Sequence, residues 1–76
     1  MENITSYNGI DFTGFLKYIN ELYEDGANAY FTGDKEEERN YLNMAFGMKE
    51  AFLLLFGDKL SLVRNDTGTE HTIVER

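Results

Sequence analysis

The sequence predicts a small, mainly α-helical α+β domain, in which an antiparallel two-helix hairpin is followed by a C-terminal β-hairpin. Two segments, 11–31 and 34–56, carry apolar residues at spacings of three and four, the period of an amphipathic helix. Thr32 and Gly33 alone separate them, and such a short connection makes the helices antiparallel neighbours. Beyond Gly57 the chain changes to short runs rich in β-branched residues, which are typical of strands.

Residues 1–10 are expected to form an extended arm ahead of the first helix. The arm contains the turn pair Asn8-Gly9 and offers Ile4, Tyr7 and Ile10 for packing.

The helix predicted over 11–31 begins at a polar residue, because the side chain of Asp11 or Thr13 can accept hydrogen bonds from unpaired first-turn amides. Gly26 either ends this helix or lies within it at a cost of about 1 kcal/mol. We favour continuation to Phe31, because Thr32-Gly33-Asp34 is the stronger break.

The helix predicted over 34–56 has clear signals at both ends. Asp34 is a suitable N-cap, three glutamates follow in the first turn, and Gly57 stands at the C-cap position. Its apolar surface extends most of the way round between Phe46 and Phe56, so we expect it to be covered on nearly all sides. Gly47, in the middle of the helix, is expected to let another helix approach closely.

The β-hairpin is predicted over 59–74, with strands at 59–64 and 69–74 joined by the turn residues 65–68. Two strands alone are marginally stable in water, so we expect the hairpin to cover one side of the helices. A chain of 76 residues forms a single domain (1–76) with a small core, and dimerisation would complete a four-helix arrangement. The residues expected to carry self-association are Met48, Phe52, Leu55 and Phe56.

Charge and composition exclude several functions. The formal net charge of −7 opposes direct binding to nucleic acid or to an anionic membrane. The longest apolar run, Ala51–Phe56, is far shorter than the ~20 residues that span a bilayer, and the N-terminus does not have the pattern of a signal peptide. We therefore expect a cytoplasmic protein. A small acidic chain without Cys or Pro is also typical of accessory proteins of phages and mobile elements, for which the compartment would be the host-cell cytoplasm.

The inventory of catalytic groups is thin. His71 is the one imidazole, there is no thiol, and no run of residues matches a calcium-binding loop. His71 is expected to pack beside Val63 or to face water. We therefore expect no enzymatic activity, no cofactor and no metal.

A protein-binding surface is the favoured functional interpretation. Between residues 20 and 40 the chain carries seven carboxylates against two cations, and tyrosines lie beside them. This surface would fit a protein partner with a basic surface, although the same charges would also serve solubility alone. One alternative is an inhibitor of a nucleic-acid-binding defence protein, of the anti-CRISPR or anti-restriction kind, that occupies its basic groove; another is a homo-oligomeric structural or assembly protein. The candidate partner-binding residues are Tyr18, Glu21, Glu24, Asp25, Tyr30, Asp34, Glu36, Glu37 and Glu38.

Overall fold

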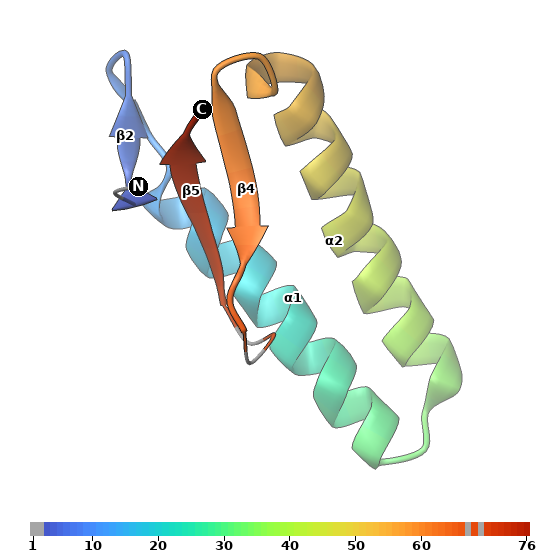
Figure 1. The fold of residues 1–76 in the computed structure, drawn as a ribbon. Coiled ribbons are helices and arrows are strands. Elements are labelled where there is room, and N and C mark those ends of the chain that lie inside the picture. Colours follow the sequence, from blue (N-terminus) through green and yellow to red (C-terminus); the bar gives the residue numbers. More distant parts are fainter. Residues whose placement is uncertain (1–2, 67, 69) are drawn as a thin grey trace.

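The chain has an α+β fold in the computed structural model, which describes residues 3–66, 68 and 70–76. Across these residues it contains two helices and small antiparallel β-sheets, arranged so that β4 and β5 lie along one side of the helix pair (Figure 1). None of the described residues belongs to a helix long and apolar enough to cross a bilayer. The elements in chain order are β1 (Asn3–Ile4), β2 (Ser6–Tyr7), β3 (Ile10–Asp11), α1 (Thr13–Phe31), α2 (Lys35–Phe56), β4 (Leu60–Arg64) and β5 (His71–Glu75).

The main sheet has the strand order β1-β5-β4, with all neighbours antiparallel. Ile73 in the central strand lies opposite Leu62 of β4 and Ile4 of β1, so apolar residues from three strands meet in one row. Four residues of the predicted elements lie outside the described part of the chain: strand residue 69, turn residue 67, and residues 1 and 2 of the arm.

The N-terminal arm contains structure that the sequence analysis did not predict. Asn3 and Ile4 pair with β5 and so extend the main sheet, whereas β2 and β3 form a separate pair around Asn8 and Gly9. Both turn residues have positive φ, 50° and 80°, which suits a tight turn with Asn followed by Gly. The arm is therefore attached to the body of the fold.

The helix ends follow local chemistry. At α1 the N-cap is Phe12, without a side-chain cap hydrogen bond, and not Asp11 or Thr13 as expected; Asp11 Oδ1 accepts a hydrogen bond from the Thr13 amide at 2.9 Å. At α2 the side chain of the N-cap Asp34 accepts a hydrogen bond from the Glu37 amide at 3.0 Å.

α1 continues through Gly26, which is buried against α2; a Cβ there would lie 3.4 Å from Cδ2 of Leu42. Such a Cβ would make an ordinary van der Waals contact with the Leu42 side chain, so the packing of the two helices does not require glycine at this position.

Among the described residues, the core consists of two clusters. The first is aromatic and joins helices to sheet: Phe12 and Phe52 pack edge to face with centroids 5.7 Å apart, beside the fully buried Leu60 and Ile73. The second lies between the helices and consists of Ile19, Leu22 and Ala45.

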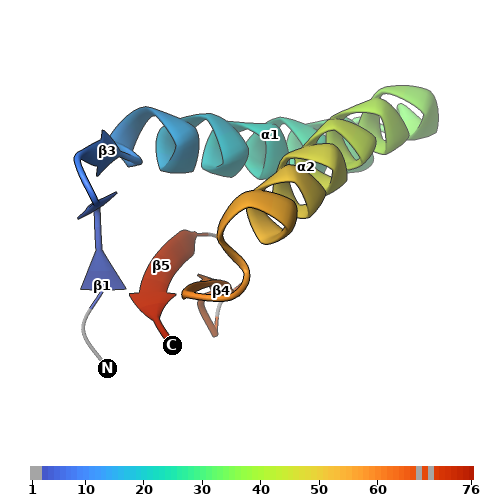
Figure 2. The ribbon, with the colours of Figure 1, turned by 90° about the horizontal axis from the view of Figure 1, so that it is seen from above.

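The sheet covers one part of the helix pair only. Figures 1 and 2 show both helices extending past the end of β4 and β5, so the loop between α1 and α2 lies far from the sheet. The molecule is elongated as a result, with extents of 41 × 22 × 18 Å. We call the part of the helix pair that lies beyond the sheet, around the connection 32–34, the distal end. The candidate site lies there.

Candidate functional site

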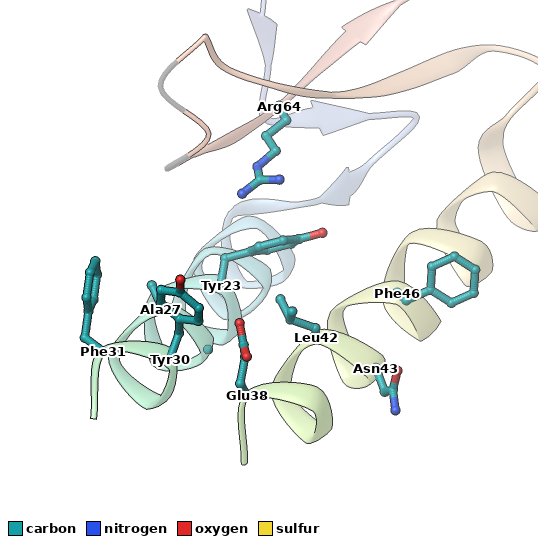
Figure 3. Close-up of a pocket in the computed structure, with 10 residues that line it drawn as sticks. Tyr23, Ala27, Tyr30, Phe31, Glu38, Leu42, Asn43, Phe46 and Arg64 are labelled. Carbon is teal, nitrogen blue, oxygen red and sulfur yellow. The ribbon is translucent and has the colours of Figure 1, made fainter. Parts of the chain in front are cut away.

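An open groove lies between α1 and α2 at the distal end, with a cavity volume of about 670 Å³. We call it the distal groove. Figure 3 shows Tyr23 and Arg64 at one end, with the Glu38 carboxylate directed between the helices. Its lining residues are Tyr23, Gly26, Ala27, Tyr30, Phe31, Glu38, Leu42, Asn43, Phe46 and Arg64.

The groove exposes large apolar side chains. Phe31 is 82% exposed, and Tyr30 and Phe46 are each 62% exposed. Tyr30 and Phe31 contact each other edge to face, with ring centroids 5.6 Å apart. Since the lone cation and the lone carboxylate of the lining are Arg64 and Glu38, the groove is an apolar surface with few polar groups, as binding sites commonly are.

The wall nearest the sheet is built around Tyr23. The Arg64 guanidinium lies 4.5 Å from the centroid of the Tyr23 ring, and Arg64 Nε donates a hydrogen bond to the Gly68 carbonyl at 2.9 Å. Lys49 Nζ donates to the Tyr23 hydroxyl at 3.2 Å. Two cations therefore hold the ring in place from different elements, α2 and β4.

His71 supports this wall from inside the fold. It is 3% exposed, and its ring lies 4.8 Å from that of Tyr23. Asn20 Oδ1 accepts the His71 backbone amide at 2.8 Å and lies 3.1 Å from Nδ1, an arrangement that places the ring proton on Nδ1. Burial, together with the charges of Lys49 and Arg64, lowers the pKa of His71 to about 4.

His71 is therefore a neutral structural residue at physiological pH. The expectation that it packs beside Val63 or faces water was wrong, because the ring points inward onto α1. Its Nε2 is buried and has no hydrogen-bond partner among the described residues. It does not line the distal groove, so it offers no catalytic group to an occupant of that groove.

The predicted partner-binding residues separate into two groups. Tyr30 and Glu38 line the distal groove, and Glu24 lines an adjoining hollow of about 420 Å³ that also contains Glu70. The others are exposed but line neither hollow: Tyr18, Glu21, Asp25, Asp34, Glu36 and Glu37. We call the carboxylates from Glu21 to Glu38 the acidic tip; within residues 3–66, 68 and 70–76 none of them forms an ion pair.

The predicted self-association residues do not share one surface. Phe52 is 2% exposed and packs on Phe12 and Phe15, so it belongs to the core of its own chain. Met48 and Phe56 are half-buried, and both contact core clusters. Leu55 is 74% exposed and is the one member of this set that a partner could reach freely.

Sequence reasoning missed the apolar half of the groove. Phe31 was placed on the apolar stripe of the first helix and Phe46 among the apolar residues outside the seam of the second, whereas Leu42 was not singled out; periodicity alone does not reveal where the sheet ends and leaves them uncovered. The position of Phe46 off the main seam of its helix was the available signal.

No group of three His, Asp or Glu residues in the described part of the chain is arranged to hold a metal ion. Comparison with known protein families, with curated protein sequences and with solved structures finds no match.

Proposed function

We propose that this chain is a non-enzymatic protein-interaction module that binds a partner segment in the distal groove. The observation that carries the proposal is the exposure of Tyr30, Phe31 and Phe46 around one groove. Contiguous apolar surface of this kind is typical of protein-binding sites. Aromatic side chains are also enriched among the residues that contribute most to binding energy.

The charge around the groove indicates a basic partner. Glu38 lies in the groove and Glu24 beside it, and the rest of the acidic tip surrounds this end of the molecule. Carboxylates without ion-pair partners are available to lysines and arginines of another protein. Arg64 is the one cation in the groove lining, and it already contacts Tyr23 and Gly68.

The shape of the groove favours a short amphipathic helix as the bound segment. The groove runs between two antiparallel helices, and from Tyr23 to Phe31 it follows about 12 Å of α1. A helix presenting apolar residues at i, i+3, i+4 and i+7 would place them between α1 and α2, with basic residues beside the glutamates. The proposed partner is therefore a protein with a basic, amphipathic helical segment.

A synthetic peptide provides the test. The probe is a fluorescein-labelled helix-forming peptide with leucines at i, i+3, i+4 and i+7 and lysines on its other face, titrated with the full chain by fluorescence anisotropy. We expect binding that Phe31→Ser and Phe46→Ser each weaken about tenfold or more, because each removes an exposed aromatic side chain from the lining of the groove. Increasing salt should weaken binding as well.

The controls separate groove binding from simple charge attraction. Leu54→Ser changes a residue that is 86% exposed but lies outside the groove, so binding should be unaffected. A scrambled peptide of the same composition should bind more weakly. Equal binding of both peptides, or no effect of the groove variants, would refute the proposed site.

A second candidate partner is the basic groove of a nucleic-acid-binding defence protein, which the chain would inhibit. The acidic tip favours it, because Glu36, Glu37 and Glu38 are consecutive on α2 and Glu21, Glu24 and Asp25 extend along α1. Carboxylates on such a surface can take the place of phosphates. The chain would then displace DNA from purified restriction or CRISPR nucleases in a mobility-shift assay. Replacing Glu36, Glu37 and Glu38 by Gln would abolish displacement, whereas Phe31→Ser would not.

A further inference from the structure

The smaller hollow beside the distal groove lies between α1 and the connection from β4 to β5, and its volume is about 420 Å³. Tyr23, Ala27 and Arg64 line both this hollow and the distal groove, so the two adjoin each other. We call it the side hollow. Among the described residues, those that line it without lining the groove are Glu24, Asn28, Gly68 and Glu70.

Three side chains of the side hollow offer acceptor oxygens. They are the carboxylates of Glu24 and Glu70 and the amide of Asn28. Within residues 3–66, 68 and 70–76, none of these three side chains forms a hydrogen bond or an ion pair. The oxygens are therefore available to donors of a bound group.

The backbone that carries these acceptors is held in place by the fold. Glu24 and Asn28 lie one turn apart on α1. The Asn65 amide donates to the Glu70 carbonyl at 2.8 Å, and the Glu70 amide donates to Asn65 Oδ1 at 3.2 Å. The position of each acceptor is thus set by contacts within the chain, which lowers the cost of ordering them around a ligand.

Arg64 does not neutralise the two carboxylates. Its guanidinium lies 4.5 Å from the centroid of the Tyr23 ring, and its Nε donates to the Gly68 carbonyl (Figure 3). Gly68 has a φ of 72°, and a Cβ at this position would lie 3.3 Å from Nη2 of Arg64, so the guanidinium packs against the glycine. Two carboxylates and one cation leave the described lining with a net negative charge, which favours a cationic occupant.

We propose that the side hollow binds one lysine side chain of the segment that occupies the distal groove, with the lysine ammonium between Glu24, Asn28 and Glu70. The inference rests on the proposed function and adds the residue that the partner segment must carry. The apolar stem of the lysine would cross the exposed methyl group of Ala27, which lines both the groove and the hollow.

The number of acceptor groups favours lysine over arginine. An ammonium has three N–H donors, one for each acceptor group, so its burial leaves no donor unpaired. The guanidinium of arginine is wider and planar, and its five donors point in fixed directions. Three acceptor groups do not match that arrangement.

Lysine replacement in the synthetic peptide identifies the side chain that enters the side hollow. Each lysine of the amphipathic peptide is replaced in turn by norleucine, which keeps the stem and lacks the charge, and the dissociation constant for the full chain is measured by fluorescence anisotropy. Replacement at one position should weaken binding about tenfold or more. The other lysines remain in solvent, so their replacement should weaken it about threefold or less. Arginine at the one sensitive position should bind more weakly than lysine.

A double-mutant cycle assigns the sensitive lysine to the side hollow. Glu24→Gln and Glu70→Gln should each weaken binding of the lysine peptide about fivefold or more and leave the norleucine peptide nearly unchanged, because no ammonium is then present to pair with the carboxylate. Glu21→Gln is the matched control, since Glu21 is exposed on α1 but lines neither the groove nor the hollow; it should affect both peptides equally. Circular dichroism verifies that each variant is folded.

The results distinguish the lysine site from the proposed function. Equal losses at every lysine, equal binding of the arginine peptide, or equal effects of Glu24→Gln on both peptides would overturn the lysine site. If Phe31→Ser and Phe46→Ser still weakened binding in that case, the distal groove would remain supported. No binding of the peptide, or binding insensitive to both phenylalanine variants, would refute the proposed function and the lysine site with it.

Discussion

At the scale of single residues, His71 is the buried titratable group on which the Tyr23 wall depends. Its folded-state pKa of about 4 is below the ordinary value of 6.5, so the unfolded chain binds a proton more readily than the folded chain between these values. The free energy of unfolding should therefore fall as the pH is lowered from 6.5 to about 4, and should be insensitive to this residue above that range. Urea unfolding across this interval measures the effect.

The variant His71→Phe isolates this contribution from the titration of carboxylates. The difference in free energy of unfolding between the unmodified chain and His71→Phe should change with pH between 6.5 and about 4. A difference that stays constant would show that His71 does not gain its proton on unfolding.

Phe52 was expected at a self-association surface, but it lies in the core of its own chain. It packs against Phe12, Phe15 and Phe56, so Phe52→Ala should lower the free energy of unfolding by about 3–5 kcal/mol. Phe31→Ala, at a residue that is 82% exposed, should change it by less than about 0.5 kcal/mol. Similar losses for both variants in chemical denaturation would contradict the described core.

Some contacts of single residues could be predicted from the sequence, because they are made with near neighbours along the chain. Asp34 caps α2 through a bond to an amide three positions away. The contacts of His71 could not be predicted, because its partner Asn20 lies 51 positions away and the orientation of the ring depends on strand register. Local chemistry was therefore predictable and long-range contacts were not.

At the scale of elements, the end of α2 depends on Gly57. Its φ of −59° is ordinary, but a Cβ at this position would lie 2.5 Å from the Leu53 carbonyl oxygen. Gly57→Ala should therefore lower the free energy of unfolding by about 1–3 kcal/mol. Gly26→Ala is the control: its Cβ would meet Leu42 at 3.4 Å, and the gain in helix propensity of about 1 kcal/mol offsets that contact. Thermal and urea unfolding of the pair would contradict this account if Gly57→Ala were the more stable variant.

The short strands show the limit of element prediction. The periods of α1 and α2 extend over many residues, whereas β1 is two residues long and has no period to recognise. Its pairing with β5 joins the two ends of the chain, so no local signal indicates it. The helices were thus the predictable part of the fold.

At the scale of the whole molecule, this acidic chain leaves an apolar groove exposed between its two helices. Composition indicates that a chain this short has more apolar surface than its core can bury. Composition does not indicate which apolar surface stays exposed, because that depends on how far the sheet extends along the helix pair. The groove begins at Tyr23 of α1 and at Arg64, the last residue of β4, where the sheet ends.

The central claim is that partners bind in the distal groove. The most direct measurement is a two-dimensional ¹H–¹⁵N NMR titration of the full chain with the lysine-flanked amphipathic peptide. Amide shifts should concentrate in Tyr23–Phe31 of α1, in Glu38–Phe46 of α2 and at Arg64, with little change in the rest of β4 and in β5. Shifts confined to the sheet or to Leu53–Leu55, or no shifts at saturating peptide, would contradict it.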